Sequence, residues 1–394
     1  MKINRVASYR TLYLSVCMLG VAFAAIAAEP PIITIDAPGA GTGQFQGTGC
    51  FAFTDCSVLL NNFGAVTGYY LDANNVYHGF VRSPAGKFTS FQAPGADTTP
   101  QDFNGTLPNA INDAGAIAGE YYDVNNEEHG FLRSPEGKFT NFDVPGGTAG
   151  TTTPIALNLE GAIVGYYLDQ SGGFQGFLRK PDGTFETWSG PHGCVTTPSV
   201  GCFGTAAFGI NVFGFIAGAS EDNSGNFVDR GLIRSPSGKI TTYTVPAAGT
   251  GPYQGTGSPG SSAPINVFGA VASYYIDSKN VVHGYLRSPL GEIATYDVPG
   301  EGPQGIGCFN DCSIGLNDFG VITGYYLDAN NVYHGFVRNP KGKVTSFDAP
   351  GADQTAGSFN GTFPVSINDQ GAITGYYLDS SNVNHAFLVL PTEW

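Results

Sequence analysis

The sequence has few charged residues, and positive charge is the scarcer kind. Only 12% of its 394 residues are Asp, Glu, Lys or Arg, and 17 basic residues stand against 32 acidic ones. A coiled coil, a long helical bundle and a disordered acidic chain all need many more charges, so these classes are excluded. The acidic balance also argues against a nucleic-acid backbone or an anionic membrane surface as a partner.

Long hydrophobic runs are absent beyond the N-terminal segment, which is typical of an export signal. Lys2, Arg5 and Arg10 precede a mostly apolar stretch, and Ala25-Ile26-Ala27 supplies the small residues that a signal peptidase recognises. We predict a signal peptide over residues 1–27, one domain over 28–394, and no membrane insertion. Without the three basic residues, 14 basic residues remain against 32 acidic ones. The product is expected to be secreted and extracellular, with the periplasm as the alternative.

Cysteine is scarce, but its spacing is informative. Of seven cysteines, Cys17 lies in the predicted signal peptide, and Val16 before it is bulky where lipidation needs a small residue. The other six form three sequence-local pairs: Cys50 with Cys56, Cys194 with Cys202, and Cys308 with Cys312. A zinc site is the alternative, but the pairs lie far apart and no His accompanies them at ligand spacing. Three local disulfides in an oxidising compartment are the favoured interpretation, and neither a metal nor another cofactor is predicted.

Against this sparse background, one unit recurs seven times. The segment Gly68-Tyr69-Tyr70-Leu71-Asp72 returns, intact or weakened, every 46 to 55 residues. We number the repeats 1 to 7 by the aspartate that ends each copy: Asp72, Asp123, Asp169, Asp222, Asp277, Asp328 and Asp379. A period near 50 residues is the length of a propeller blade with four strands.

Turn signals divide each repeat into four strands. Asn-x-x-Gly separates the first strand from the second in all seven repeats, beginning at Asn61, and Ser-Pro-x-Gly separates the third from the fourth, as at Ser83. Both patterns suit tight reversals. Typical strands are expected at 372–378 for the second, 332–338 for the third and 343–348 for the fourth. Each repeat is therefore predicted to be an antiparallel meander.

The two ends of the chain complement each other. Residues 32–39 match the fourth strand of repeat 6, whereas repeat 7 stops at Leu390-Pro391 after its third strand. The N-terminal strand is expected to supply the missing one. The predicted fold is all-β, a seven-bladed β-propeller of four-stranded antiparallel blades, closed by pairing the N-terminal strand with the C-terminal blade.

The repeat carries a family resemblance. His78-Gly79-Phe80, His334-Gly335-Phe336 and His385-Ala386-Phe387, with the Asn-x-x-Gly and Gly-Tyr-Tyr elements, resemble the repeat of the bacterial "extracellular repeat, HAF family". The resemblance spans the whole chain after the signal peptide and implies an exported bacterial protein. That family brings no established activity or catalytic residues. Gln175 and Arg230 depart from it by replacing the His.

The repeated polar residues are interpreted as structural. If Asp72 opposes Val76 across the turn, Tyr70 faces His78 and Gly68 faces Phe80, so the imidazole packs on the tyrosine ring. Histidines in separate blades cannot converge on one ion. The recurring arginines are expected to bind acidic side chains or backbone carbonyls within the blade: Arg82, Arg133, Arg179, Arg234, Arg287 and Arg338. The turn at Asp72 lacks the later acid of a calcium loop, so a simple hairpin is favoured.

The connections from the fourth strand to the next first strand are long, and they are the predicted binding surface. Strand alternation puts them on one face of the ring together with the turns that begin at the repeat aspartates. Aromatic and amide residues in these loops are the candidate ligand-binding set: Phe103, Asn104, Tyr253, Gln254, Phe359 and Asn360. They suit a polysaccharide or a protein ligand. The favoured function is a monomeric, non-catalytic binding or surface-interaction module for a polar polymer. The alternative is a carbohydrate-active enzyme, a glycosidase or lyase, on the same face, and converging carboxylates with a shifted pKa in the central channel would favour it.

Overall fold

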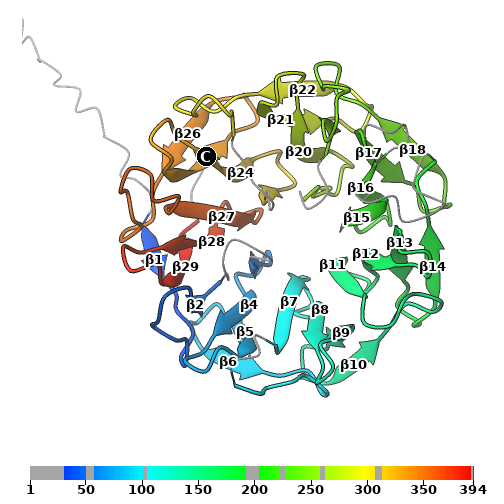
Figure 1. Ribbon diagram of the computed structural model, residues 1–394, viewed down its shortest axis with the longest axis vertical. Helices are drawn as coiled ribbons and strands as arrows, with labels where there is room; N and C mark the ends of the chain where they lie inside the picture. Colours follow the sequence, from blue (N-terminus) through cyan, green and yellow to red (C-terminus); the bar gives the residue numbers. More distant parts are fainter. Residues whose placement is uncertain are drawn as a thin grey trace, which may run out of the picture.

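The described part of the chain consists of β-strands arranged in a ring. The computed structural model describes residues 31–49, 57–100, 104–191, 204–221, 227–257, 262–306, 313–391 and 394. Every named element in these ranges is a strand. Figure 1 shows antiparallel sheets placed side by side around a central axis, so the architecture is a β-propeller and the all-β prediction is confirmed. Among the described residues no helix is both long enough and apolar enough to cross a membrane.

The strands follow the order predicted from the turn signals. Repeat 1 contains β2 (Gly47–Thr48), β3 (Val58–Leu60), β4 (Val66–Leu71), β5 (Tyr77–Arg82) and β6 (Phe88–Phe91). Repeat 2 contains β7 (Thr106–Ile111), β8 (Ile117–Tyr122), β9 (Glu128–Arg133) and β10 (Phe139–Phe142), and repeat 3 contains β11 (Thr153–Leu157), β12 (Ile163–Leu168), β13 (Phe174–Arg179) and β14 (Phe185–Trp188). Repeat 4 contains β15 (Thr205–Ile210), β16 (Ile216–Glu221), β17 (Asp229–Arg234) and β18 (Ile240–Tyr243), and repeat 5 contains β19 (Gly255–Thr256), β20 (Val271–Ile276), β21 (Val282–Arg287) and β22 (Ile293–Tyr296). Repeat 6 contains β23 (Ile314–Leu316), β24 (Ile322–Leu327), β25 (Tyr333–Arg338) and β26 (Val344–Phe347), and repeat 7 contains β27 (Thr362–Ile367), β28 (Ile373–Leu378) and β29 (Asn384–Val389).

The register within a repeat matches the prediction. In repeat 1, Val66 faces Arg82, Gly68 faces Phe80 and Tyr70 faces His78 across β4 and β5. Phe80 is fully buried. A Cβ at Gly68 would overlap the carbonyl oxygen of Ser57 and would lie 3.3 Å from the Phe80 ring, so glycine allows both the close strand approach and the packing of the phenylalanine.

Strand β1 (Ile32–Thr34) joins the two ends of the described chain. It pairs antiparallel with β29, where Ile32 faces Val389 and Thr34 faces Phe387. The short β2 then pairs in parallel with β29 and antiparallel with β4. Repeats 7 and 1 consequently belong to one nine-stranded sheet.

Arginines at the ends of the third strands connect neighbouring repeats. Arg133 donates to the carbonyl of the next residue, as predicted, but its guanidinium also lies 4.8 Å from the ring centroid of Phe91 in repeat 1. Four further arginines stack in the same way on the fourth-strand ring of the preceding repeat: Arg179 on Phe142, Arg234 on Trp188, Arg287 on Tyr243 and Arg338 on Tyr296. The sequence predicted only acidic side chains or backbone carbonyls within the blade as partners of these arginines. The cation–π contacts with the preceding repeat are additional.

The Asn-x-x-Gly turns form a hydrogen-bonded circle. The Asn61 side-chain amide donates to the backbone carbonyl of Asn112 at 3.0 Å, and every following repeat continues the pattern up to Asn368, whose amide donates to the carbonyl of Asn61 at 3.1 Å. The intermediate donors are Asn112, Asn158, Asn211, Asn266 and Asn317. The same Asn side chain also accepts from backbone N–H groups within its own turn, as Ala65 shows. This arrangement explains why the turn needs Asn at its first position.

Candidate functional site

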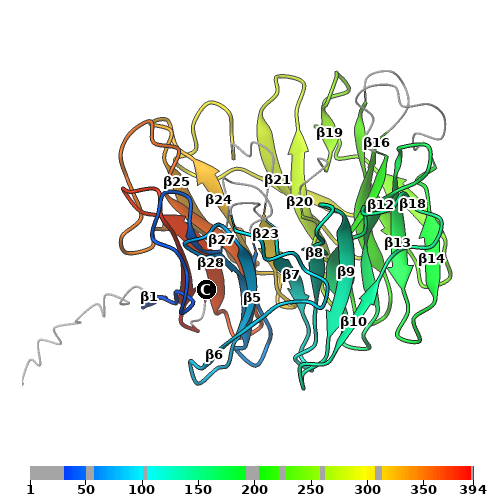
Figure 2. The ribbon, with the colours of Figure 1, turned by 60° about the horizontal axis from the view of Figure 1, so that its bottom comes forward.

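The ring has two chemically different ends. The Asn-x-x-Gly and Ser-Pro-x-Gly turns lie together at one end, which we call the turn face, because a Cβ on Gly64 would lie 3.8 Å from the Pro84 side chain. The turns that begin at the repeat aspartates and the long connections lie at the other end, which we call the loop face. Figure 2 shows the strands running between these two ends. The long connections were predicted to lie together, and the antiparallel pairing of the described strands places them so.

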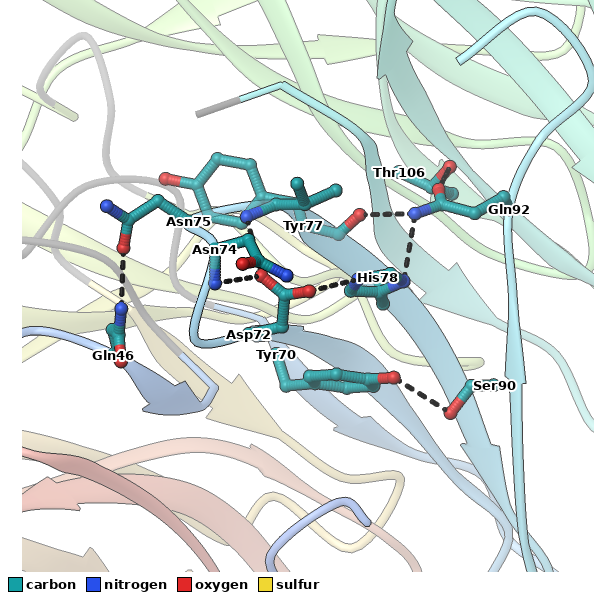
Figure 3. A network of polar contacts seen from close by, with 11 residues as sticks. Gln46, Tyr70, Asp72, Asn74, Asn75, Tyr77, His78, Ser90, Gln92 and Thr106 are labelled. Atoms are coloured by element: carbon teal, nitrogen blue, oxygen red, sulfur yellow. Dashed lines mark hydrogen bonds and ion pairs between the residues drawn. The ribbon is translucent and has the colours of Figure 1, made fainter. Parts of the chain in front are cut away.

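On the loop face, the repeated histidine takes part in a closed polar network (Figure 3). His78 stacks on Tyr70 with ring centroids 5.0 Å apart, and its two ring nitrogens contact Asp72 and Gln92. Asp72 also accepts from the backbone N–H groups of Asn74 and Val76. Burial raises the pKa of Asp72, but the bonds from Val76 and Asn74 outweigh it and leave the pKa below its usual value.

Four further repeats place the histidine between two aspartates. The Nδ1 atoms of these histidines lie 2.6 to 2.9 Å from a fourth-strand carboxylate, and their Nε2 atoms lie 3.6 to 3.8 Å from the repeat aspartate: His129, His283, His334 and His385. The hydrogen bond that Asp348 accepts raises the pKa of His334, and the one that Asp36 accepts raises the pKa of His385. Each histidine lies within its own repeat, which agrees with the structural interpretation.

One group on the loop face has the composition of a cation site. In repeat 2, one ligand atom each of Asp123, Glu127 and His129 lies within 4.8 Å of the others, and the structure records no second such group among the described residues. Asp123 accepts two backbone N–H bonds of its own turn, and His129 Nδ1 contacts Asp143. The group is thus already part of the turn, and nothing further indicates an ion.

The structure divides the predicted ligand-binding residues into two kinds. The amides of Asn104, Gln254 and Asn360 are buried, and they bond to Asp97, Asn280 and Asp353 respectively. The rings of Tyr253 and Phe359 are 58% and 43% exposed. Phe103 lies outside the described residues. The rings of Tyr253 and Phe359 are therefore accessible to a ligand, whereas the three amides stabilise the loops through hydrogen bonds within the protein.

A glycine after each amide explains how tightly these loops are held. Gly105 has φ 137°, and a Cβ there would overlap the carbonyl oxygen of Tyr77 in the preceding repeat. Gly361 repeats this arrangement beside Tyr333 with φ 140°. The loop backbone is consequently fixed against the third strand before it, and the exposed rings stand on a rigid base.

Repeat 4 departs most from the pattern on the loop face, and the sequence analysis noted only its arginine. Arg230 replaces the His, and Asp229 takes a position that is Tyr77 in repeat 1. Phe227 lies three residues before Arg230, as Asn75 lies before His78, and it has φ 52°, but the segment from Asp222 to Arg230 is two residues longer than in repeat 1. An alignment of the repeats position by position was the signal that could have found Phe227.

The turn face carries its own exposed and acidic groups. Four phenylalanines at the third position of the Asn-x-x-Gly turns are 64% to 71% exposed: Phe63, Phe213, Phe268 and Phe319. Burial raises the pKa of Asp318, and the charges of Asp369 and Asp113 add to the effect. These carboxylates accept backbone N–H bonds from neighbouring turns, as Asp318 accepts from Val267 at 2.8 Å. All six cysteines of the predicted disulfides lie outside the described residues.

Comparison with known proteins supports the fold. No protein-family model matches the chain, and no curated protein matches it in sequence. Among solved structures, it is similar to a streptogramin B lyase (14% identity, 91% of this chain and 97% of that one, TM-score 0.52) and to a virginiamycin B lyase from Staphylococcus aureus (13%, 92% and 100%, TM-score 0.53). A weaker likeness joins it to the six-bladed β-propeller lectin of Aleuria aurantia (11%, 91% and 94%, TM-score 0.40).

Proposed function

We propose that this chain is an exported, seven-bladed β-propeller of the HAF-repeat type that binds a polar polymer through its loop face without catalysis. Two contacts support a closed ring of seven blades. Strand β1 takes the fourth-strand position beside β29, and the hydrogen-bonded circle of turns continues from Asn368 of repeat 7 to Asn61 of repeat 1. Closure leaves no sheet edge for unwanted pairing.

The observation that carries the binding role is the exposed aromatic rings on rigid loops. Tyr253 and Phe359 both have φ near 55°, a conformation that is uncommon for bulky residues, and both rings are partly exposed. A ring that is already fixed loses little entropy when a ligand covers it. The many aspartates of the loop face disfavour a polyanion, so a neutral glycan or a peptide fits best.

The polar groups of the loop face favour binding over catalysis. The described repeat histidines contact the repeat aspartates, and these aspartates accept hydrogen bonds from the backbone of their own turns. Their role is therefore structural. Two described carboxylates have a raised pKa: Asp318 on the turn face, which accepts from the N–H of Val267, and Glu301 in the connection after β22, which accepts from the N–H of Val298. A carbohydrate-active enzyme on the loop face stays the alternative, because burial raises the pKa of Glu301 there and the charge of Asp297 adds to the effect. It would require that Glu301→Gln abolish a polysaccharide-cleaving activity.

A binding screen tests the proposal. The chain from residue 28 is applied to a glycan array, a peptide array and polysaccharide pull-downs. We expect a neutral polymer to bind, with little effect of EDTA or added salt. Replacing Tyr253 and Phe359 together with Ala should abolish binding and leave the melting temperature nearly unchanged, because both rings are partly exposed. Phe319→Ala, which removes a 68% exposed ring from the turn face, is the matched control and should bind normally. Equal binding by the double variant places the site elsewhere, and no binding by the unaltered chain contradicts the function.

A further inference from the structure

An exposed aromatic ring and a half-buried one stack on each other on the loop face, across the junction of repeats 4 and 5. The ring centroids of Phe227 and Tyr253 are 5.8 Å apart, and their planes differ by 21°. Phe227 lies two residues before β17, and Tyr253 lies in the connection that leads to β19. Tyr253 is 58% exposed and Phe227 is half-buried. The pair therefore offers an aromatic surface to solvent.

This pair is a departure from the repeat. At two other junctions the loop aromatic lies beside an asparagine: the N–H of Phe45 donates to the carbonyl of Asn382, and the N–H of Phe359 donates to that of Asn331. Asparagine tolerates φ above 0°, and five repeats place it there: Asn75, Asn126, Asn280, Asn331 and Asn382. Repeat 4 instead has a phenylalanine in the same strained conformation. Asparagine tolerates this conformation better than phenylalanine does, so the strain at Phe227 favours a role for its ring, as it does for Phe45, Tyr253 and Phe359, which also have positive φ.

The base of the pair is rigid. The N–H of Asp229 donates to the carbonyl of Gln254, and Asp229 pairs in parallel with Gly255. The Gln254 side chain accepts from the N–H of Gly251 at 2.8 Å and donates to Asn280 at 2.7 Å. Asp229, two residues after Phe227, and Gln254, next to Tyr253, are thus held by hydrogen bonds to the sheet and to neighbouring loops. The aromatic surface is therefore formed before any ligand binds.

We propose that Phe227 and Tyr253 form the stacking platform for a neutral β-linked glucan, an inference that rests on the proposed function and names its ligand. A β-linked glucose ring carries its hydroxyl groups at the rim and presents C–H groups on both flat faces. Covering such a face with an aromatic ring removes apolar surface from water while the hydroxyl groups stay solvated. The exposed ring of Tyr253, supported from behind by Phe227, is a flat surface that suits the extended β-linked chain better than the curved α-linked one.

Calorimetric titration with cellohexaose, and with maltohexaose as the α-linked counterpart, tests this inference. We expect cellohexaose to bind the unaltered chain and maltohexaose to bind more weakly. Phe227→Asn and Tyr253→Ala should each weaken cellohexaose binding at least tenfold. Because asparagine tolerates φ above 0° better than phenylalanine does, the melting temperature of Phe227→Asn should stay the same or rise, which separates lost binding from unfolding. Phe268→Ala on the turn face is the matched control.

The outcomes separate this inference from the proposed function. Equal cellohexaose binding by Phe227→Asn and the unaltered chain overturns the platform. The platform is also overturned if the unaltered chain does not bind cellohexaose but binds another glycan or a peptide on the arrays. In that case the proposed function stands. A chain that binds no polymer on either array overturns both.

Discussion

The packing of Ile35, just after β1, gives a direct test of whether the N-terminal strand belongs to the core. Ile35 is 4% exposed, lies in the same hydrophobic cluster as Val58 and Tyr376, and its N–H donates to the carbonyl of Ala386. Replacing it with Ala removes buried methyl groups and leaves a cavity, which costs about 2 to 5 kcal/mol at such sites. Ile33, two residues earlier, is 37% exposed, so Ile33→Ala should change stability by less than about 0.5 kcal/mol.

Scanning calorimetry of the two variants gives the comparison. For a domain of this size the core substitution corresponds to a melting temperature lower by about 3 to 7 °C, because the entropy of unfolding grows with chain length. The Ile33 variant serves as the matched control on the same segment. If Ile35→Ala melts no earlier than Ile33→Ala, the N-terminal strand is not docked in solution and the closed ring is wrong.

Three further predictions address other contacts. Asp36 raises the pKa of His385 above its ordinary value of 6.5, so this pair stabilises the fold fully below pH 6.5 and less as the pH rises through the folded-state pKa. The decrease in melting temperature caused by Asp36→Asn should therefore be larger at pH 6 than at pH 9. An equal decrease at both pH values contradicts the pairing. Arg133→Lys keeps the charge but loses the planar stack on Phe91, so it should cost about 1 kcal/mol in denaturant titrations, whereas Arg82→Lys, without a ring from a preceding strand, should cost less. Mass spectrometry after non-reducing digestion should find the three sequence-local cysteine pairs and no free thiol; long-range pairs or bound zinc would refute that assignment.

The sequence by itself determined what is local to one repeat. The turn signals set the hairpins, and a period of two residues then fixed the register, so that Tyr70 facing His78 followed from the loop length alone. The match between residues 32–39 and the fourth strand of repeat 6 likewise predicts that the N-terminal strand pairs with the last strand of repeat 7, as β1 does with β29. These contacts depend on neighbours along the chain or on strand pairing, which patterns encode.

Tertiary structure decided the contacts between repeats. Arg133 on Phe91 and the circle of asparagine amides depend on how one sheet lies against the next, and a repeat motif does not specify that placement. The same holds for the candidate site, where Asn360 has an exposed neighbour in Phe359 yet is itself buried by the crossing of the loop over the preceding strand. The stacking of Phe227 on Tyr253 joins two repeats in the same way, so only the folded ring brings those two rings together.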